Sequence, residues 1–433
     1  MNTYKNSKIK KIKAREILDS NNKPTVEVKL ETEWGKFLAS VPSGVSTGKY
    51  EAVELRDEDG GVDKAIGNIE KVIAPVLEKE GLTNQKRVDE ILIKLDGTKN
   101  KSRLGANAIL AVSMATCRAI AAAKELLLYR YISQLAESDL KLPKPSFNMI
   151  EGGKHAKNNL AFQEFMIVPQ KNLFKDNLKI GKEIYKSLKT ILEEKFGRKN
   201  IGLSREGAFT APIQKITDAF DLILEAAEKA GYKNDIRFAI DAAALSFFGE
   251  EGYKIDDKIL VKEKLIDFYK TIIEKEEYPF ISVEDPFEEE DFLGFPEIIE
   301  EMGERLIVFG DDLLASNVER IKLAHEKGTY NGLILKPNQI GTVTETLAAA
   351  KLAKSYNWKI MVSNRAGETE DDFIADLAVG IGADFIKSGA PFPKERMAKY
   401  NRLLRIEEEL KKRREFCEIS SKKLRKFLRK FTR

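Results

Sequence analysis

The chain is poor in cysteine and histidine. Its 433 residues include two of each, and Cys117 and Cys417 lie far apart, with no second cysteine or histidine at metal-ligand spacing beside either one. This scarcity argues against a disulfide framework. It is typical of proteins of the reducing cytosol, so we expect a cytoplasmic location.

Long apolar runs are also missing. No stretch of eighteen consecutive apolar residues occurs, and the segment from Met1 to Arg15 is polar and basic, without the apolar core of a secretory signal. We therefore expect neither a membrane span nor a secretory signal. The composition, 42% hydrophobic and 33% charged, suits a globular protein with a sizeable core.

Positive charge is concentrated at the C-terminus. The formal net charge is +4, but residues 411–433 hold eleven Lys or Arg against two Glu, so the rest of the chain is mildly acidic. Apolar residues recur in this segment at roughly helical spacing: Phe416, Ile419, Leu424, Phe427, Leu428 and Phe431. The pattern predicts a basic amphipathic tail over 411–433. Such a tail either packs its apolar face on the protein or a neighbouring subunit, or contacts RNA or another anionic surface.

Two patterns divide the remaining chain. Residues 1–138 contain strand-like segments at 24–30, 34–41 and 53–56, followed by a helical, alanine-rich stretch, and predict a compact α+β domain. From 139 to 410, strand-like runs alternate with amphipathic helical stretches at 218–230, 262–277 and 318–327. That alternation predicts parallel strands with helical crossovers, and the number of units favours a closed (β/α) barrel over an open sheet.

Several apolar runs in the second part end in a charged residue. Lys336 follows three apolar residues, and other runs end at Asp241, Glu284, Asp311 and Lys387. In a (β/α) barrel the C-terminal ends of the strands meet at one face, so these five residues are expected to form one site. Taken singly, each is more simply a solvated strand end or a helix-capping carboxylate, and the capping alternative stays open for the three acids.

The charges indicate a chemistry. Three carboxylates without a thiolate or imidazole suit Mg²⁺ better than zinc. Lys336 and Lys387 would face an anionic substrate beside the metal. Their mutual repulsion and the dication would lower their pKa values, so that one lysine could serve as a base.

Three further residues are candidates by position. Glu164 lies in the strand-like run 161–168, Glu206 lies in a loop, and His155 lies in a glycine-rich loop. His325, in a helical stretch, is better explained as a surface residue. The loop from Pro42 to Gly48 contains small residues and is either an ordinary turn or a mobile lid.

Taken in order, these motifs resemble the enolase family, over nearly everything from Lys13 to about Leu410. The matching segments are residues 14–20, 42–48, 104–110, 152–169, 282–286, 336–341, 365 with 367–371, and 387–391. The resemblance implies an α/β fold in which a small α+β cap domain precedes a modified eight-stranded (β/α) barrel. It also implies a homo-oligomer, a dimer or larger.

The resemblance further implies a Mg²⁺-dependent lyase that reversibly dehydrates 2-phosphoglycerate, a phosphorylated carboxylate, to phosphoenolpyruvate in glycolysis and gluconeogenesis. Lys336 would remove the α-proton, Glu206 assisted by Glu164 would protonate the departing hydroxyl, and His155 would close over the substrate. The pairing of a lysine base with Mg²⁺ is known for the enolase superfamily. Asp241, Glu284 and Asp311 would hold the first Mg²⁺, and Ser46 would help to bind a second Mg²⁺. The expected substrate contacts are Gln163, Ser363, Asn364, Arg365, Ala366 and Lys387.

The chain departs from the family pattern within this site. Asn364 stands where enolases usually carry a histidine, and Ala366 stands where a serine helps to hold the phosphate. Arg205 places a cation in the loop before Glu206, although the sequence does not fix the direction of its side chain. The segment Asn21-Asn22-Lys23 replaces Arg-Gly-Asn, which puts the family's subunit contact there in doubt.

These departures leave two alternatives. One is an enolase-like protein of low activity kept for binding or scaffolding, which only Asn364 and Ala366 support. The other is a barrel enzyme of the wider superfamily acting on a different carboxylate, against which Ser46, Arg365 and Lys387 weigh.

Overall fold

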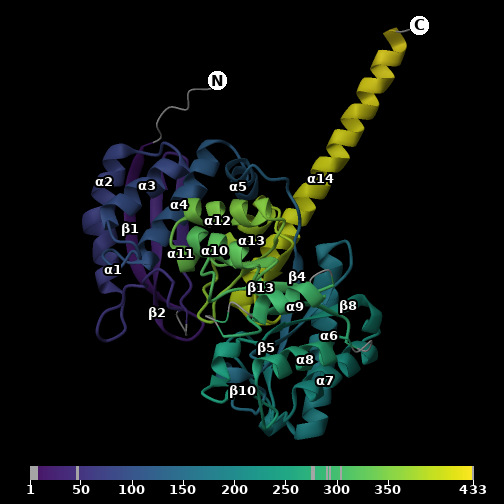
Figure 1. Cartoon of the computed structure of the whole chain (residues 1–433). Helices are drawn as coiled ribbons and strands as arrows, with labels where there is room; N and C mark the ends of the chain where they lie inside the picture. The colour runs from purple at the N-terminus through teal and green to yellow at the C-terminus, as the bar shows by residue number, and fades with distance from the viewer. Residues whose placement is uncertain are drawn as a thin grey trace.

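The structure is a computed structural model that describes residues 8–44, 48–274, 278–288, 291, 294–302 and 305–431. A three-stranded antiparallel sheet covered by helices forms the N-terminal part, shown in purple and blue in Figure 1, and a barrel of strands with outer helices forms the rest. This confirms the predicted fold class. The domain limits at residues 138 and 410 stay predictions.

The N-terminal sheet buries alternate residues of its middle strand. Val26, Val28 and Leu30 are fully buried, and their strand packs against the alanine-rich helix α4. The elements of this part are β1 (Ile9–Leu18), β2 (Pro24–Thr32), β3 (Gly35–Ser40), α1 (Asp63–Asn68), η1 (Ile69–Ile73), α2 (Ala74–Glu80), α3 (Gln85–Asp96), α4 (Ala106–Ala123) and α5 (Leu128–Ala136).

The predicted strand at 53–56 is wrong. The main-chain N–H of Val53 donates to the Asn100 carbonyl, and that of Ala52 donates to the Gln339 carbonyl in the barrel. The segment therefore satisfies its backbone against the loop at Asn100 and against α11 (Pro337–Ile340), and it joins the small domain to the barrel instead of extending a sheet.

Among the described residues one helix, α4, is long and apolar enough to cross a membrane, with a mean hydropathy of 1.5 over residues 106–123. Of this stretch, 83% is buried inside the protein, and it packs on β2, β3 and α3. Burial of that kind is typical of the core helix of a folded domain.

Eight strands close the barrel. Their order is β16, β15, β14, β13, β12, β8, β5 and β4, and β4 pairs back with β16. All neighbours are parallel except at β5, which runs antiparallel to both β4 and β8. The strands are β4 (Lys144–Glu151), β5 (Glu164–Pro169), β8 (Ile236–Asp241), β12 (Phe280–Glu284), β13 (Ile307–Gly310), β14 (Gly332–Leu335), β15 (Lys359–Ser363) and β16 (Phe385–Lys387).

The reversed strand explains the position of Glu164. Because β5 runs against its neighbours, its first residue lies at the edge where the other strands end. Glu164 is in register with Asp241 on β8 and with Glu151 on β4. An acid at the beginning of a strand thus joins the acids at the ends of the others.

Side chains inside the barrel form one apolar layer: Met166, Val168, Ala239, Phe309, Ile334, Met361 and Phe385. Since strand side chains alternate between faces, residues two positions nearer the C-terminal rim also point inward. Counting two residues from Ala239, Phe309, Ile334 and Phe385 gives Asp241, Asp311, Lys336 and Lys387. The pleat of the barrel therefore aims these four charged groups at one space.

Helices cover the outside of the barrel, and the three helical stretches predicted in this part are confirmed within a few residues as α7, α8 and α10. The helices are α6 (Phe174–Phe196), α7 (Ile216–Lys229), α8 (Lys262–Ile273), α9 (Gly294–Met302), α10 (Val318–Lys327), α11 (Pro337–Ile340), α12 (Val343–Ser355), α13 (Phe373–Gly380) and α14 (Lys394–Phe431). Single 3₁₀ turns are η2 (Gly153–His155), η3 (Arg198–Asn200), η4 (Lys233–Asp235) and η5 (Ala244–Ser246). Short strands are β6 (Gly202–Leu203), β7 (Phe209–Thr210), β9 (Phe248–Gly249), β10 (Gly252–Ile255) and β11 (Lys258–Leu260).

Candidate active site

A small cavity of about 70 Å³ lies at the C-terminal end of the barrel. Its lining contains most of the residues expected in the site: His155, Gln163, Glu164, Glu206, Asp241, Asp311, Lys336, Ser363, Asn364, Arg365, Ala366 and Lys387. Of the other expected residues, Glu284 contacts Lys387, and Ser46 lies outside the described residues. Groups that are up to 232 positions apart in the chain, His155 and Lys387, therefore meet around one space.

Lys336 directly follows β14, and its side chain is 12% exposed. Its Nζ contacts Asp311 Oδ2, and the other oxygen of Asp311 accepts a hydrogen bond from Gln339 Nε2 at 2.9 Å. Burial lowers the pKa of Lys336, and Asp311 and Glu284 raise it, so that the net pKa lies above the ordinary value for lysine. The expected lowering is therefore wrong for the protein's own charges, because Asp311 lies closer than the repelling lysine.

Lys387 is the centre of a carboxylate cluster. Its Nζ lies 2.7 Å from Glu284 Oε2, 3.3 Å from Glu164 Oε2 and 3.4 Å from Asp241 Oδ2. Burial lowers its pKa, and the three acids raise it well above the ordinary value. Burial and the neighbouring Asp241 raise the pKa of Glu284. One lysine thus faces three buried acids, and this surplus of negative charge favours a further cation.

The acids that lie closest together differ from the expected metal trio. Asp285, Asp311 and Asp312 offer oxygens within 4.8 Å of one another. However, the two oxygens of Asp285 accept the main-chain N–H groups of Asp311 and Asp312, both at 3.0 Å. Asp285 therefore holds the backbone that carries Asp311. The trio of Asp241, Glu284 and Asp311 fits a hard divalent cation by donor chemistry, because all three offer carboxylate oxygens and are buried.

Glu164 and Glu206 form a second acidic pair with opposite pKa shifts. Burial raises the pKa of Glu164, and the charges of Glu206 and Asp241 add to the rise. Burial also raises the pKa of Glu206, but the charges of Arg396, Lys387, His155 and Lys336 together bring it below its ordinary value. In the described structure Glu206 Oε2 has no hydrogen-bond partner, whereas Glu164 Oε2 lies 3.3 Å from Lys387 Nζ. The opposite shifts make Glu164 the more readily protonated of the two acids.

His155 is held by an acid that the sequence analysis did not single out. Its Nδ1 lies 3.0 Å from Glu151 Oε1. Glu151 is fully buried at the end of β4, and its other oxygen, Oε2, accepts a hydrogen bond from the Asn148 side chain at 2.7 Å. Burial lowers the pKa of His155, and Glu151 raises it above the ordinary value. The alternation of β4 places Glu151 at the rim, and this spacing is the signal that could have identified it.

Arg365 forms a buried two-armed ion pair with Glu51. The nitrogens lie 2.7 and 3.2 Å from the two carboxylate oxygens, and Asn338 Oδ1 accepts from Arg365 at 3.2 Å. Glu51 also accepts from the N–H of Gly48, next to the loop that contains Ser46. Glu51 therefore links the guanidinium to the base of that loop. No motif in the sequence marked this residue.

Asn364 is 3% exposed and lies between the main chain of Lys387 and the guanidinium of Arg396. Its amide nitrogen donates to the Lys387 carbonyl at 3.2 Å, and its oxygen accepts from Arg396. Arg205, offered by the sequence as a nearby cation, is exposed, and only its carbonyl joins the site by accepting from Arg396. Arg396, fully buried on α14, therefore takes the position that Arg205 could have filled.

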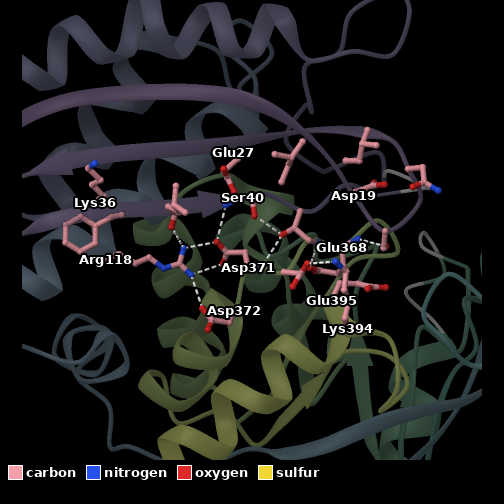
Figure 2. A pocket seen from close by; sticks show the side chains of 18 residues that line it. Asp19, Glu27, Lys36, Ser40, Arg118, Glu368, Asp371, Asp372, Lys394 and Glu395 are labelled. Atoms are coloured by element: carbon pink, nitrogen blue, oxygen red, sulfur yellow. Dashed lines mark hydrogen bonds and ion pairs between the residues drawn. The ribbon is translucent and has the colours of Figure 1, made fainter.

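A larger cleft of about 850 Å³ lies elsewhere, between the N-terminal sheet, the 368–372 loop and the start of α14 (Figure 2). Its polar side chains bind one another: Arg118 contacts Asp371 at 2.8 Å and Asp372 at 3.2 Å. None of the strand-end lysines and acids lines it. By volume alone this cleft would be chosen as the active site, but the strand-end lysines and carboxylates line the smaller cavity.

Comparisons with known proteins agree with this geometry. Residues 139–425 match the family model described as "Enolase, C-terminal TIM barrel domain", and residues 9–132 match "Enolase, N-terminal domain". A relative named "Enolase B" from Dictyostelium discoideum is 48% identical over 424 residues, which cover 93% of this chain and 95% of that protein. Two matched domains in the expected order, together with identity of this extent, show that the chain belongs to the enolase family.

Proposed function

We propose that this enolase reversibly dehydrates 2-phosphoglycerate to phosphoenolpyruvate as a Mg²⁺-dependent hydro-lyase. One observation carries the assignment of roles: a strand-end lysine and a carboxyl pair with divergent pKa values line the same buried cavity as the metal-suited acids. Removal of an α-proton and loss of a β-hydroxyl need one base and one acid on a single substrate. Both are available around this cavity.

Lys336 is the proposed base, and Glu206 the proposed acid. A base must lose a proton before it can accept one, and in the protein Asp311 holds the Lys336 ammonium. Engagement of Asp311 by a cation would weaken that hold and lower the lysine pKa. Glu164, the more readily protonated of the two acids, passes a proton through Glu206 to the departing hydroxyl.

Asp241, Glu284 and Asp311 would hold the first Mg²⁺. When bound, Mg²⁺ stabilises the second negative charge that proton removal places beside the substrate carboxylate. Arg365 and Lys387 would contact the charged groups of the substrate, with Gln163, Ser363, Asn364 and Ala366 around it, and His155 would close the site. Ser46 would help to hold a second Mg²⁺ with the phosphate.

The family membership disfavours the low-activity alternative, and the proposed base, the principal acid and two of the metal acids, Asp241 and Asp311, line the cavity. The test is a coupled assay for phosphoenolpyruvate formation from 2-phosphoglycerate. Activity that requires Mg²⁺ and is lost with a chelator is expected. A folded protein that forms no phosphoenolpyruvate under these conditions would contradict the proposal.

A homo-oligomer is the proposed assembly, in a cytoplasmic location. The large cleft in Figure 2 is bordered by Leu18 and Leu38, which are 60% and 49% exposed beside acidic and basic side chains. Exposed leucines among charges of both signs suit a self-complementary contact. Sedimentation equilibrium should give a multiple of the 48.9 kDa chain mass, and a single-chain mass at micromolar concentration would contradict this.

The C-terminal tail gives a separate prediction. Helix α14 continues to Phe431 and extends away from the barrel in Figure 1, and the side chains after Lys412 lie outside the described residues. We propose that the basic segment 411–433 contacts RNA. Truncation after Leu410 should leave turnover unchanged and abolish retention on single-stranded RNA. Retention by the full chain should fall steeply with salt, because each neutralised phosphate adds about 0.7 to the log–log slope.

The matched control for this experiment is the truncated chain on the same RNA at the same salt. Absence of retention by the full chain, or retention that does not change with salt, would instead favour packing of the tail on the protein or on a neighbouring subunit.

A further inference from the structure

The first turns of α14 bind loops that carry proposed active-site residues. The guanidinium of Arg396, which is fully buried, donates to the carbonyls of Arg365 at 2.6 Å, Ala366 at 2.8 Å and Arg205 at 2.9 Å. Arg365 and Ala366 follow β15, whereas Arg205 immediately precedes Glu206. One side chain therefore joins the backbone beside the proposed acid to the backbone of the proposed substrate loop.

Neighbouring residues of the helix hold the same region. Lys399 Nζ lies 2.6 Å from Glu368 Oε2 and also contacts the Thr369 carbonyl. The Tyr400 hydroxyl donates to the Gly389 carbonyl at 2.9 Å and accepts from the N–H of Ser388 at 3.2 Å. The beginning of α14 thus binds the loops that follow β15 and β16. Of Arg396, Lys399 and Tyr400, it is Arg396 that also binds the loop of Glu206.

The loop of Glu206 lies directly against the beginning of α14. Gly207 has a φ of +81°, and a Cβ there would collide with the Pro393 ring just before α14. The Glu206 carbonyl accepts from the N–H of Ala390 at 2.9 Å. Contact this close leaves the main chain at Glu206 little freedom to move away from Arg396.

The charge of Arg396 is not neutralised by an ion pair with any carboxylate in the described part of the chain. Its partners are backbone carbonyls and the Asn364 oxygen, and its Nε has no partner. A buried guanidinium without an ion pair costs stability, so such a group is seldom kept for packing alone. Its nearest electrostatic effect in the site falls on Glu206, whose pKa it lowers against burial.

We propose that Arg396 is a positioning residue for Glu206, holding the acid's loop at a fixed place relative to the Arg365 loop. The departing hydroxyl of a substrate bound at Arg365 then meets the acid. This inference rests on the proposed function, because it assumes that Glu206 protonates the leaving group. Lys336 directly follows β14 and receives no bond from Arg396 in the described structure. Removal of the α-proton by Lys336 and protonation of the hydroxyl by Glu206 can therefore be measured separately.

The test compares Arg396→Lys with Arg402→Lys in the full-length enzyme. Arg402 lies on the same helix and forms two 2.7 Å bonds to Asp376, away from the site, and its side chain is 14% exposed, so its variant controls for the loss of a largely buried guanidinium from α14. Two rates are measured with Mg²⁺: phosphoenolpyruvate formation, and exchange of the α-proton of 2-phosphoglycerate with D₂O, which reports the Lys336 step. The unfolding midpoint of each variant is measured in parallel.

For Arg396→Lys we expect phosphoenolpyruvate formation to fall about ten- to a hundred-fold, with KM little changed and α-proton exchange close to that of the unaltered enzyme. Arg402→Lys should keep both rates. Equal loss of both rates in Arg396→Lys, or loss of neither, would overturn the inference. If Arg396→Lys does not fold, Arg396→Gln is measured in the same way, and failure of both to fold would assign the residue to stability and also overturn it. An unaltered protein that neither dehydrates nor exchanges would instead refute the proposed function.

Discussion

Lys336→Ala is expected to abolish measurable dehydration. Removing a general base costs about 10²- to 10⁴-fold in rate, and more when no other group can take the proton. The only other lysine among the described residues that line the cavity is Lys387, and its Nζ lies within 3.4 Å of three carboxylates. Lys387 is therefore held as an ammonium and cannot replace the base. The measurement is phosphoenolpyruvate formation at saturating Mg²⁺, with α-proton exchange as a second readout.

The control for this variant is its fold and its metal affinity. Lys336 bonds through its side chain to Asp311, and the loss of that contact frees a carboxylate expected to bind the metal. The alanine variant should therefore stay folded, be less stable without metal because Asp311 loses its ion pair, and still be stabilised by Mg²⁺. Near-normal turnover in a folded Lys336→Ala protein would refute the proposed base.

The sequence was most informative at the barrel rim. Apolar runs that end in a charged residue correctly placed Asp241, Glu284 and Lys387 at strand ends, because a strand buried on both faces excludes charged side chains from its interior. The inward direction of these groups follows from the two-residue alternation. Fold class and the clustering of the strand-end charges were therefore predictable from local pattern alone.

The direction of individual strands and the distances between side chains were less predictable from the sequence. The run at 161–168 does not reveal that β5 is antiparallel, since alternation reads the same in both directions. Glu51 and Arg396 were missed because each is an isolated charged residue outside an apolar run, and a buried partner 314 positions away, as for Glu51 and Arg365, leaves no local signal. The pKa of Lys336 was misjudged because charge signs can be read from a sequence but separations cannot. The first strand, β1, buries only Ile9 and Ile12 fully, so no alternating pattern marked it.

Asn364→His combined with Ala366→Ser is expected to raise kcat roughly ten- to a hundred-fold, the low end of what one acid–base participant contributes. The resemblance places a histidine and a serine at these positions in relatives. Asn364 offers a neutral amide that cannot carry a proton, and it lies beside Arg396 near the proposed acid. An imidazole there would add a titratable group close to the leaving hydroxyl. The serine hydroxyl should mainly lower KM, because a hydrogen bond to a charged group is worth about 1.5–3 kcal/mol.

The contacts of Asn364 also define the result that would contradict this prediction. Arg396 donates toward residue 364, so an imidazole in that position must offer it a lone pair and stay neutral in the ground state. Arg396 already supplies a permanent positive charge beside Glu206, so the histidine contributes proton transfer and little additional charge. Ala366→Ser alone is the matched control, since it should change KM without the rise in kcat. If the double variant is folded and its kcat stays flat or falls, the site has been rebuilt around asparagine, and the interpretation of Asn364 as an impairing substitution is wrong.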